Sequence, residues 1–368
     1  MKAGSLKLYN YRNYQQLDLR FSPGINIFLG QNAQGKTNIV EALYYAAMGH
    51  SHRTHNDGEL IHWEQEAALV DFSFSRLEVE NNLKIKLQKG KRRQLVLNGG
   101  KLTLKELIGS FNVVLFSPED LFLVKGAPAE RRRFLNTEIS QASPAYYAEL
   151  RRYTRLLQQR NTLLKRIRER KASSEMLDMW DEQLADSAAK IVQRRLEAVK
   201  KLKMLANLMQ RRISDNRENL QLSYEFAAGK SENMTENLVS WYNNALKECR
   251  EFDIFRGVTS VGPQRDDLEF TVNGKSLKSY GSQGQQRTSA LALKLSELEF
   301  LRSETGEYPV LLLDDVMSEL DEIRRRQLLA FVRRENIQTI ITATDAAYFP
   351  HDEKACYYQV QAGRITMR

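Results

Sequence analysis

The sequence predicts an α/β fold that is assembled from both ends of the chain around an inserted helical domain. Three observations support this prediction. A glycine-rich loop at 30–37 lies between an apolar run and a helical segment, a second apolar run at 310–315 ends in two aspartates, and a long basic stretch separates the two. We expect one domain to be built from 1–124 together with 258–368, and a helical arm from 125–257.

The loop at 30–37 reads Gly-Gln-Asn-Ala-Gln-Gly-Lys-Thr and fits the phosphate-binding pattern G-x-x-x-x-G-K-[ST]. A predicted strand at 25–29 precedes it and a predicted helix at 38–44 follows it, as the pattern requires. Glycines let the backbone turn sharply and present N–H groups to phosphate oxygens. We therefore expect Lys36 to reach the β- and γ-phosphates of ATP and Thr37 to ligate Mg²⁺. The expected nucleotide-binding residues of this loop are Gly30, Gln31, Asn32, Ala33, Gln34, Gly35, Lys36, Thr37 and Asn38.

Two segments predict antiparallel β structure. Segment 70–97 alternates apolar and polar residues and ends in Asn98-Gly99-Gly100, which favours a tight hairpin turn. Segment 268–272 is followed by Asn273-Gly274 and predicts a second hairpin. We expect the first of these sheets to lie beside the phosphate-binding loop.

The middle of the chain carries the excess positive charge. The formal net charge of the whole chain is +9, and between Lys125 and Leu220 there are 22 Lys and Arg residues against 12 Asp and Glu. Segment 150–168 contains seven cations and no acid, with leucines at helical spacing. Apolar positions from Trp180 to Leu205 predict a second long helix. An antiparallel helical hairpin is the simplest arrangement of the two.

The acid-free run favours a polyanionic partner, because surface helices usually mix the two signs of charge. The alternative to a polyanionic partner is that the basic face of the helix is only exposed to solvent. Few aromatic residues lie among the arginines, which favours phosphate contacts with double-stranded DNA over base stacking on single strands. The expected DNA-binding residues of this helix are Arg151, Arg152 and Arg155.

The C-terminal part supplies the remaining pieces of a nucleotide site. The apolar strand ends at Asp314, the usual position of a second Mg²⁺ ligand, and Asp315 stands where a carboxylate would activate water. Ser282 is a natural N-cap for the periodic helix that follows it. Its hydroxyl, with the free N–H groups of the helix end, would form an anion site.

In chain order these motifs resemble those of the ABC-type ATPases. Segment 281–285 resembles the Leu-Ser-Gly-Gly-Gln signature, Asp314 with Asp315 the Asp-Glu pair, 318–321 the D-loop, and 339–345 the last strand with its switch residue. The resemblance implies an ABC-type P-loop ATPase head, with a mixed sheet, helices and an antiparallel β subdomain, into which the helical arm is inserted. It implies catalytic roles for Asp315 and Thr344. Because these replace the usual Glu and His, we expect slow hydrolysis.

Seven segments spread over the chain resemble the bacterial RecF family of recombination mediators. These segments are 7–14, 30–38, 49–54, 116–121, 131–136, 261–268 and 311–321. The resemblance implies nucleotide binding by Arg12 and Asn13. One departure is Gln264, where the family more often has His.

Further arginines in these segments are expected to contact ligands. Arg131, Arg132 and Arg133 are candidates for DNA binding. Arg53 resembles the arginine of the loop that SMC-type heads place near nucleotide or DNA. Either ligand is therefore a candidate for contact with Arg53.

The RecF resemblance also implies a function. ATP and Mg²⁺ would hold two copies together in a symmetric dimer, with Ser282, Gly284 and Gln285 completing the partner's nucleotide site. The dimer would bind double-stranded DNA at single-strand gap junctions and, with RecR and RecO, promote loading of RecA in gap repair, replication restart and SOS induction. Weak, DNA-stimulated ATP hydrolysis would open the dimer.

Three other classes of protein fit the sequence less well. An SMC-like motor needs long heptad arms for which this chain is too short, and a transporter ATPase subunit would have a short insertion without strong basic charge. A nuclease of the overcoming-lysogenisation type would add an acidic metal-binding domain, which the sequence does not suggest. No run of eighteen apolar residues and no signal peptide occur, so we expect a cytoplasmic protein that associates with the nucleoid when bound to DNA.

Overall fold

The computed structural model describes residues 1–229, 237–349 and 355–367, and it divides into two compact units. The first unit, here called the head, comprises Met1–Phe122, Arg212–Asn216 and Gln286–Arg368. The second unit, the arm, comprises Leu123–Arg211 and Arg217–Gln285. The arm therefore begins two residues before the expected boundary but extends well beyond 257.

Strand pairing explains the difference at the second boundary. The segment after 257 contains a strand that pairs along its whole length with a strand of the arm, from Asp267 opposite Glu225 to Val272 opposite Leu220. This segment is close to the signature motif in the sequence. It nevertheless belongs to the arm, because its backbone hydrogen bonds are made with a strand of the arm.

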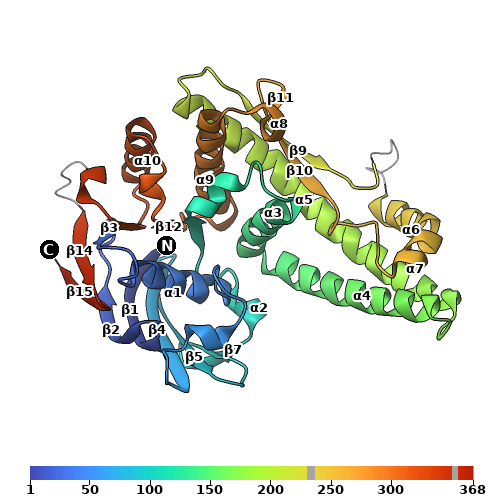
Figure 1. Cartoon of the computed structure of the whole chain (residues 1–368), viewed down its shortest axis with the longest axis horizontal. Helices are drawn as coiled ribbons and strands as arrows, with labels where there is room; N and C mark the ends of the chain where they lie inside the picture. Colours follow the sequence, from blue (N-terminus) through green and yellow to red (C-terminus); the bar gives the residue numbers. More distant parts are fainter. Residues whose placement is uncertain (230–236, 350–354, 368) are drawn as a thin grey trace. The chain divides into compact units, whose positions relative to one another are not determined.

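One sheet of the head is antiparallel, as the alternation of residues predicted. Its strands are β1 (Lys2–Tyr11), β2 (Tyr14–Arg20), β4 (Ala67–Arg76), β5 (Val79–Gln88), β6 (Gln94–Leu97) and β7 (Gly100–Leu102), in the order β2-β1-β4-β5-β6-β7 (Figure 1). Val70, Phe72 and Phe74 of β4 are buried, and the residues between them are partly exposed. Asn98 and Gly99 both have positive φ, in keeping with the predicted hairpin turn between β6 and β7.

The second sheet of the head is mixed. Its strands are β3 (Ile25–Leu29), β8 (Val113–Phe116), β12 (Val310–Asp314), β13 (Thr339–Ala343), β14 (Cys356–Gln361) and β15 (Arg364–Met367), in the order β15-β14-β3-β13-β12-β8. Only β15 runs antiparallel to its neighbour. Every residue of β3, β12 and β13 is buried, as expected for parallel strands covered on both faces. The carboxyl ends of these three strands therefore lie at one edge of the sheet, where ligands bind in open α/β sheets.

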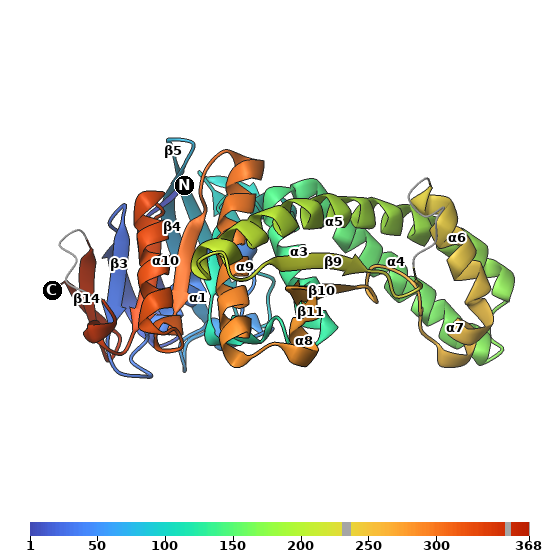
Figure 2. The same ribbon diagram turned by 90° about the horizontal axis from the view of Figure 1, so that it is seen from above.

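Helices of the head connect and cover these sheets. They are α1 (Lys36–Met48), α2 (Leu104–Leu107), α9 (Gln283–Thr305) and α10 (Glu322–Arg334), with 3-10 turns η1 (Asp57–Leu60), η2 (Pro118–Phe122), η5 (Val316–Ser318) and η6 (Ala346–Tyr348). Figure 2 shows the head from a second side, with β3, β14 and α10 labelled. Within the described ranges no helix combines the length and apolar character needed to cross a membrane.

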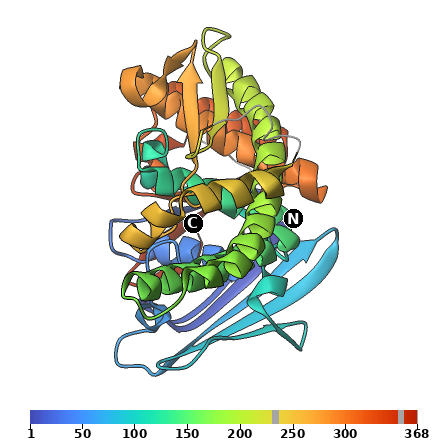
Figure 3. The same cartoon turned by 90° about the vertical axis from the view of Figure 1, so that its right-hand side faces the viewer.

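The arm is mainly helical. Its elements are α3 (Pro128–Ala142), α4 (Pro144–Arg168), η3 (Ser174–Met176), α5 (Leu177–Ile213), α6 (Leu238–Glu248), α7 (Arg250–Arg256) and α8 (Leu277–Tyr280), with a small sheet of β9 (Leu220–Glu225), β10 (Asp267–Val272) and β11 (Lys275–Ser276). Strands β9 and β10 run beside α5 in each view (Figure 3). The predicted helical hairpin is confirmed, because α4 and α5 run antiparallel. Residues later in α4 contact residues earlier in α5. Two of these contacts join Glu149 to Ser187 and Arg160 to Asp181.

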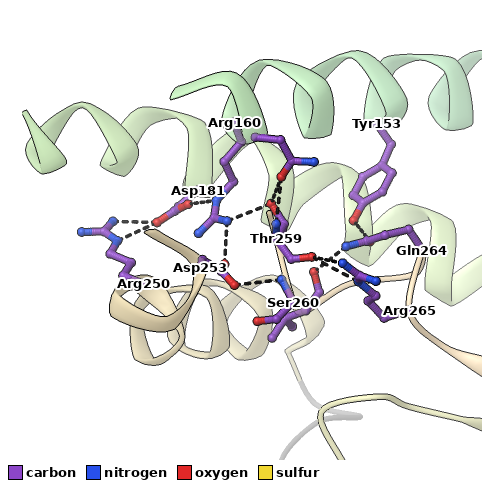
Figure 4. A network of polar contacts seen from close by, with 11 residues as sticks. Tyr153, Arg160, Asp181, Arg250, Asp253, Thr259, Ser260, Gln264 and Arg265 are labelled. Atoms are coloured by element: carbon purple, nitrogen blue, oxygen red, sulfur yellow. Dashed lines mark hydrogen bonds and ion pairs between the residues drawn. The ribbon is translucent and has the colours of Figure 1, made fainter. Parts of the chain in front are cut away.

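Buried charge holds helices of the arm together. Arg160 of α4 is fully buried and donates from Nε to Asp181 of α5 at 2.6 Å and from Nη1 to Asp253 of α7 at 2.7 Å (Figure 4). Its Nη1 also donates to the Thr259 hydroxyl at 2.9 Å. One arginine therefore ties two helices and a loop to α4. Arg160 belonged to the basic run in the sequence, yet its charge is neutralised inside the fold.

A second buried arginine organises another part of the arm. Arg195 of α5 is 2% exposed and donates to the hydroxyls of Tyr146 and Tyr224, at 3.1 and 3.0 Å, and to the Pro263 carbonyl at 2.7 Å. Gln264, the departure noted above, accepts from the Tyr153 hydroxyl and donates to the Val261 carbonyl at 3.0 Å. Segment 261–264 is thus held in place by side chains of α4 and α5.

Candidate nucleotide site

The phosphate-binding loop has the predicted strand, loop and helix context. It follows β3 directly and leads into α1 at Lys36. Gly35 has a φ of +111°, and a Cβ atom there would lie 2.6 Å from the Asn13 side chain and 2.9 Å from the Tyr14 hydroxyl. At Gly30 an added Cβ would collide with the Val360 carbonyl oxygen. Both glycines are therefore required by the backbone path and by close neighbours.

Lys36 lies inside the loop that it closes. Its side chain is 6% exposed, and Nζ donates to the carbonyls of Gly30 at 2.5 Å and Gln31 at 2.8 Å. Burial lowers the pKa of Lys36, and the carboxylates of Asp315 and Asp314 offset part of this effect. The ammonium group is thus held against two backbone carbonyls of the loop, beside the cavity where phosphate oxygens would bind.

The carboxyl ends of β12 and β13 bring the acidic residues to α1. The Thr37 hydroxyl donates to Oδ1 of Asp314 at 2.9 Å, and the Thr342 hydroxyl donates to the same oxygen at 2.7 Å. The backbone N–H of Asp315 donates to the Thr342 hydroxyl at 2.9 Å. Sequence reasoning missed Thr342, although its place in a buried strand beside Asp314 was available as a signal.

Asp315 occupies a strained and unusual position. Its φ is +52°, in the left-handed region, and its Oδ1 atom is buried with no hydrogen-bond partner among the described residues. Burial raises the pKa of Asp315, Lys36 acts in the opposite direction, and Asp314 adds to the rise. A carboxylate that lacks a protein partner and is aimed into a cavity can orient a water molecule.

These groups line one cavity of about 220 Å³. Its lining residues are Asn32, Ala33, Gly35, Lys36, Thr37, Asn38, Arg53 and Asp315. The cavity thus brings six residues of the predicted loop together with two residues from distant segments. Gln34 instead uses its side chain to accept from the Ala362 N–H at 2.6 Å, which fastens the loop to the β14–β15 turn.

The donor set fits a hard divalent cation. The Thr37 hydroxyl and the Asp314 carboxylate supply oxygen ligands, which Mg²⁺ prefers, and they already lie within hydrogen-bond distance of each other. Asp315 offers a further unpartnered carboxylate oxygen nearby. Magnesium bound there would neutralise charge on the β- and γ-phosphates of a nucleotide.

Glu41 organises the arginines around the cavity, and sequence reasoning did not find it. This α1 residue is fully buried, and its carboxylate accepts two hydrogen bonds from Arg12, at 2.8 and 2.6 Å. The Ser51 hydroxyl donates to it at 2.5 Å, and Nη1 of Arg53 lies 3.6 Å from it. Burial raises the pKa of Glu41, but hydrogen bonds from Arg12 and Ser51 outweigh this effect, so the net pKa lies below its ordinary value.

Arg53 and Asn13 border the cavity through Asn38. Nη1 of Arg53 donates to Oδ1 of Asn38 at 3.0 Å, and Nδ2 of Asn38 donates to Oδ1 of Asn13 at 2.7 Å. Arg53 lines the cavity, whereas Arg12 faces Glu41. The structure therefore favours the nucleotide as the target of Arg53.

The signature residues lie at the start of α9 and belong to the arm. The Ser282 hydroxyl accepts from the Gln285 N–H at 3.2 Å, and Gln285 Oε1 accepts from the Ser282 N–H at 3.1 Å. This reciprocal pair is a capping box, so the predicted N-cap is confirmed. Ser282, Gly284 and Gln285 thus belong to a different unit from the phosphate-binding loop.

Thr344 lies apart from the groups that surround Asp314. It is exposed, one residue beyond the end of β13, and it is not among the residues that line the cavity. The side chain that touches both aspartates is Thr342, two residues earlier. Residues two apart in a strand share a face, so the difference arises because β13 ends at Ala343 and Thr344 lies beyond the strand.

The predicted DNA-binding residues of α3 differ in their environment. Arg131 is 2% exposed, and its Nε and Nη2 atoms each donate to Asp267 at 2.8 Å. Arg132 is partly buried and donates to the Asp266 carbonyl at 2.8 Å, whereas Arg133 is exposed. A guanidinium that is buried in a bidentate pair cannot reach a DNA phosphate, so we remove Arg131 from the candidates.

The three arginines of α4 that were predicted to bind DNA, Arg151, Arg152 and Arg155, are all exposed. Arg152 forms ion pairs with Glu149 at 3.5 Å and Asp186 at 3.4 Å. Arg151 and Arg155 have no ion pair among the residues that the structure describes. These two arginines are therefore the stronger candidates for phosphate contacts.

Comparison with known proteins connects this geometry to one family. The RecF/RecN/SMC N-terminal domain family matches residues 3–366. The DNA replication and repair protein RecF of Halothermothrix orenii is 46% identical over 348 residues, which cover 94% of this chain and 92% of that protein. The protein of the same name from Geobacillus kaustophilus is 44% identical over 366 residues, covering 98% of each.

Solved structures agree with this similarity. The recombination mediator protein RecF with ATP in the RecFOR pathway has a TM-score of 0.91 and 35% identity, covering 100% of this chain and 97% of that one. The structure described as RecF-ATPrS has a TM-score of 0.92 and 36% identity, covering 99% and 97%. The Smc head domain of Pyrococcus furiosus has a TM-score of 0.56 at 15% identity, a likeness of fold alone. The predicted ABC-type head is thereby confirmed.

Proposed function

Because this chain belongs to the RecF family, within the wider RecF/RecN/SMC group, we propose that it is a DNA replication and repair protein that binds and hydrolyses ATP. The observation that carries the proposal is the convergence of Lys36, Thr37 and Asp315 on one cavity, with Asp314 bonded to Thr37 behind them. The ATP-bound structures of similar proteins support the choice of nucleotide. In this proposal Thr37 and Asp314 hold Mg²⁺ and Asp315 orients the attacking water.

ATP is proposed to act as a link between two copies of the chain. Ser282 sits at the capped start of α9, and its hydroxyl and neighbouring N–H groups form an anion site at the N-terminus of a 23-residue helix. This site and Lys36 belong to different units of one chain. We propose that each Ser282 completes the nucleotide site of the partner copy, so that two nucleotides bind in one symmetric dimer.

The dimer is proposed to bind double-stranded DNA at gap junctions. Arg151 and Arg155 of α4 and Arg133 of α3 are exposed cations that suit phosphate contacts. The RecFOR pathway named for the similar structures supports RecR and RecO as partners and RecA loading as the outcome. Slow, DNA-stimulated hydrolysis is proposed to open the dimer and release DNA.

The test is the mass of the protein in solution with a non-hydrolysable ATP analogue, measured by light scattering after gel filtration. Lys36→Met should lose both nucleotide binding and the dimer. Ser282→Arg should bind nucleotide like the unmodified chain yet remain a monomer, because a bulky cation would occupy the contact with the γ-phosphate.

Ser279→Arg is the matched control, since Ser279 is an exposed serine three residues earlier. It should dimerise normally. A Ser282→Arg variant that also dimerises normally would show that Ser282 does not complete the partner's site.

A further inference from the structure

The rim of the antiparallel sheet in the head carries a second concentration of positive charge. From Lys84 to Lys105 the chain contains eight Lys and Arg residues and no Asp or Glu. The segment runs through β5, β6 and β7 to α2, which lie together in Figure 1. This segment lies outside 125–220, the stretch that carries the excess positive charge of the chain. The rest of the chain is close to neutral in total, so its net charge does not reveal this local group of cations.

Strand register places three of these cations on one face. Lys84 and Lys86 alternate with the buried Ile85 and Leu87, so both point to the solvent side of β5. Lys84 lies opposite Val96 of β6, which lies opposite Lys101 of β7. Two strand spacings separate Lys84 from Lys101, or about 10 Å.

Only part of this charge is neutralised by neighbours. Lys84 pairs with Asp71 at 3.5 Å, Lys89 with Glu66 at 3.4 Å, and Arg93 with Asp57 at 3.4 Å. The other five are exposed and form no ion pair with any residue that the structure describes. These five define the rim patch: Lys86, Lys91, Arg92, Lys101 and Lys105.

The turn that carries part of the patch is anchored. Nη1 of Arg93 donates to the Tyr45 hydroxyl of α1 at 2.9 Å, and its guanidinium lies 5.6 Å from the centre of the Tyr45 ring. Tyr45 is fully buried. Arg92 and Lys91 therefore project from a turn that is fastened to the helix of the nucleotide site.

Like charges on one face repel one another, and surfaces without a charged partner usually mix both signs. An unneutralised patch is thus most readily explained by an anionic ligand. The contrast with the arm supports this view, because Arg131 and Arg160 are buried and paired with carboxylates.

We propose that the rim patch binds the phosphate backbone of double-stranded DNA, as a contact of the head in addition to those of the arm. Double-stranded DNA carries one charge per about 1.7 Å of its axis. Lys86 and Lys101 of the patch are at least two strand spacings, or about 10 Å, apart, so the patch would meet several phosphates. Segment 84–105 contains no Phe, Tyr or Trp, which argues against stacking on the bases of a single strand. The inference rests on the proposed DNA binding.

The test compares two variants that each lose three exposed cations. The rim variant combines Lys86→Ala, Arg92→Ala and Lys101→Ala. The control variant combines Lys2→Ala, Arg20→Ala and Arg364→Ala, which are exposed head residues outside the patch and form no ion pair among the described residues. The two variants therefore have the same net charge.

Binding of a labelled blunt DNA duplex is measured by fluorescence anisotropy over a salt series, with a non-hydrolysable ATP analogue present. Each lost phosphate contact should reduce the slope of log K against log salt by about 0.9, so the rim variant should lose roughly two to three units of slope. At low salt the affinity of the rim variant for the duplex should fall by about tenfold or more, because phosphate contacts supply much of the binding. The control should keep both slope and affinity, and both variants should keep ATP binding and melting temperature.

The outcomes separate the inference from the function on which it rests. If the unmodified chain binds duplex and the rim variant matches the control, the rim inference is wrong and the proposed DNA binding stands. If the unmodified chain does not bind DNA with the ATP analogue, both fail. A rim variant that binds DNA normally but is no longer retained on immobilised polyglutamate would assign the patch to an acidic protein and overturn the DNA proposal.

Discussion

The hydroxyl of Thr37 lies 2.9 Å from Oδ1 of Asp314, although 277 residues separate them in the chain. Parallel pairing of β3 with β13 and of β13 with β12 brings the two residues to the same edge of the mixed sheet. The phosphate loop and the acidic strand therefore form one site only when both ends of the chain are folded together.

The first prediction concerns the metal. Thr37→Val preserves shape but removes the hydroxyl, so Mg²⁺ should bind less well while nucleotide alone still binds. Because loss of even an outer-shell group costs about 10- to 100-fold in metal affinity, we expect at least a tenfold loss here. Titration of a fluorescent ATP analogue with and without Mg²⁺ measures it. Thr37→Ser retains the hydroxyl and should behave normally; an equal loss in both variants would contradict the role of the hydroxyl.

The second prediction concerns hydrolysis. Asp315→Asn should bind ATP and form a lasting dimer but release phosphate much more slowly, since the amide cannot accept the proton of the attacking water. The raised pKa of Asp315 means that its carboxylate becomes protonated at a higher pH than an ordinary aspartate. Phosphate release by the unmodified chain should therefore decline with falling pH, beginning at a higher pH than an ordinary aspartate would give.

The control for this experiment is Asp345→Asn, at an exposed residue beyond β13. It should hydrolyse ATP with the unmodified pH profile. Loss of ATP binding in Asp315→Asn, measured by filter binding, would instead make Asp315 a metal ligand.

The third prediction concerns Glu41 as a positioning residue for Arg12. Glu41→Gln leaves a partly buried guanidinium without its counter-charge, so we expect a loss of about 3 kcal/mol or more in the free energy of unfolding. ATP affinity should fall as well. In the double variant Arg12→Met with Glu41→Met, stability should largely recover, because apolar groups replace both charges. ATP affinity should not recover. Full recovery of ATP affinity would show that Arg12 has no part in nucleotide binding.

The pH dependence of stability provides an independent readout of the same pair. The net pKa of Glu41 is lowered in the folded state, so its contribution is fully present above the ordinary glutamate pKa and is lost as pH falls through the folded value. Chemical denaturation in a series of acidic buffers should show this loss for the unmodified chain. The Glu41→Gln variant should lack that part of the pH dependence.

The fourth prediction concerns the buried arginine of the arm. Arg160→Leu leaves Asp253 buried without its cation, while Asp181 keeps only its ion pair with Arg250. Removing one partner of a buried ion pair typically costs about 3–5 kcal/mol. The arm should therefore melt at a lower temperature, or become more sensitive to proteolysis. Arg155→Leu, on the exposed face of the same helix, should keep normal stability. A stable Arg160→Leu variant with weakened DNA binding would contradict the structural role and restore Arg160 to the DNA surface.

The fifth prediction ranks the arginines of α4 in DNA binding. Arg151→Ala with Arg155→Ala should reduce the salt slope of duplex binding by about 1.8, since each phosphate contact contributes about 0.9. Arg152→Ala should change it less, because Arg152 is already paired with Asp186 and Glu149. Anisotropy over a salt series, beside a melting curve, measures both. An unchanged slope in a normally folded double variant would move the search to Arg133.

Local motifs were predictable because their geometry depends on residues close in the chain. The loop around Gly35, the hairpin at Asn98-Gly99 and the N-cap at Ser282 each follow from backbone preferences or side-chain hydrogen bonds over a few positions. The helical hairpin followed from apolar spacing in the same way. The order of the motifs also carried the family resemblance over the whole chain.

The environment of individual charges was not predictable from the same sequence. Arg131, Arg160 and Arg195 look like any other arginine in a basic stretch, but each is buried against carboxylates, hydroxyls or carbonyls from distant segments. Lys86 and Lys101 lie in a segment whose alternating residues predicted only β structure, yet strand register gathers them on one exposed face. Glu41 and Thr342 became recognisable only from the side chains that they contact.

The sequence by itself thus determined the nucleotide loop, the class of fold and the family, because these depend on local spacing and on the order of motifs along the chain. Only the tertiary structure decided which threonine supports the two aspartates, which carboxylate holds Arg12, and which cations remain free for a ligand. Burial and pairing depend on contacts between residues far apart in sequence, and an unpaired charge becomes distinguishable from a neutralised one only after the chain has folded.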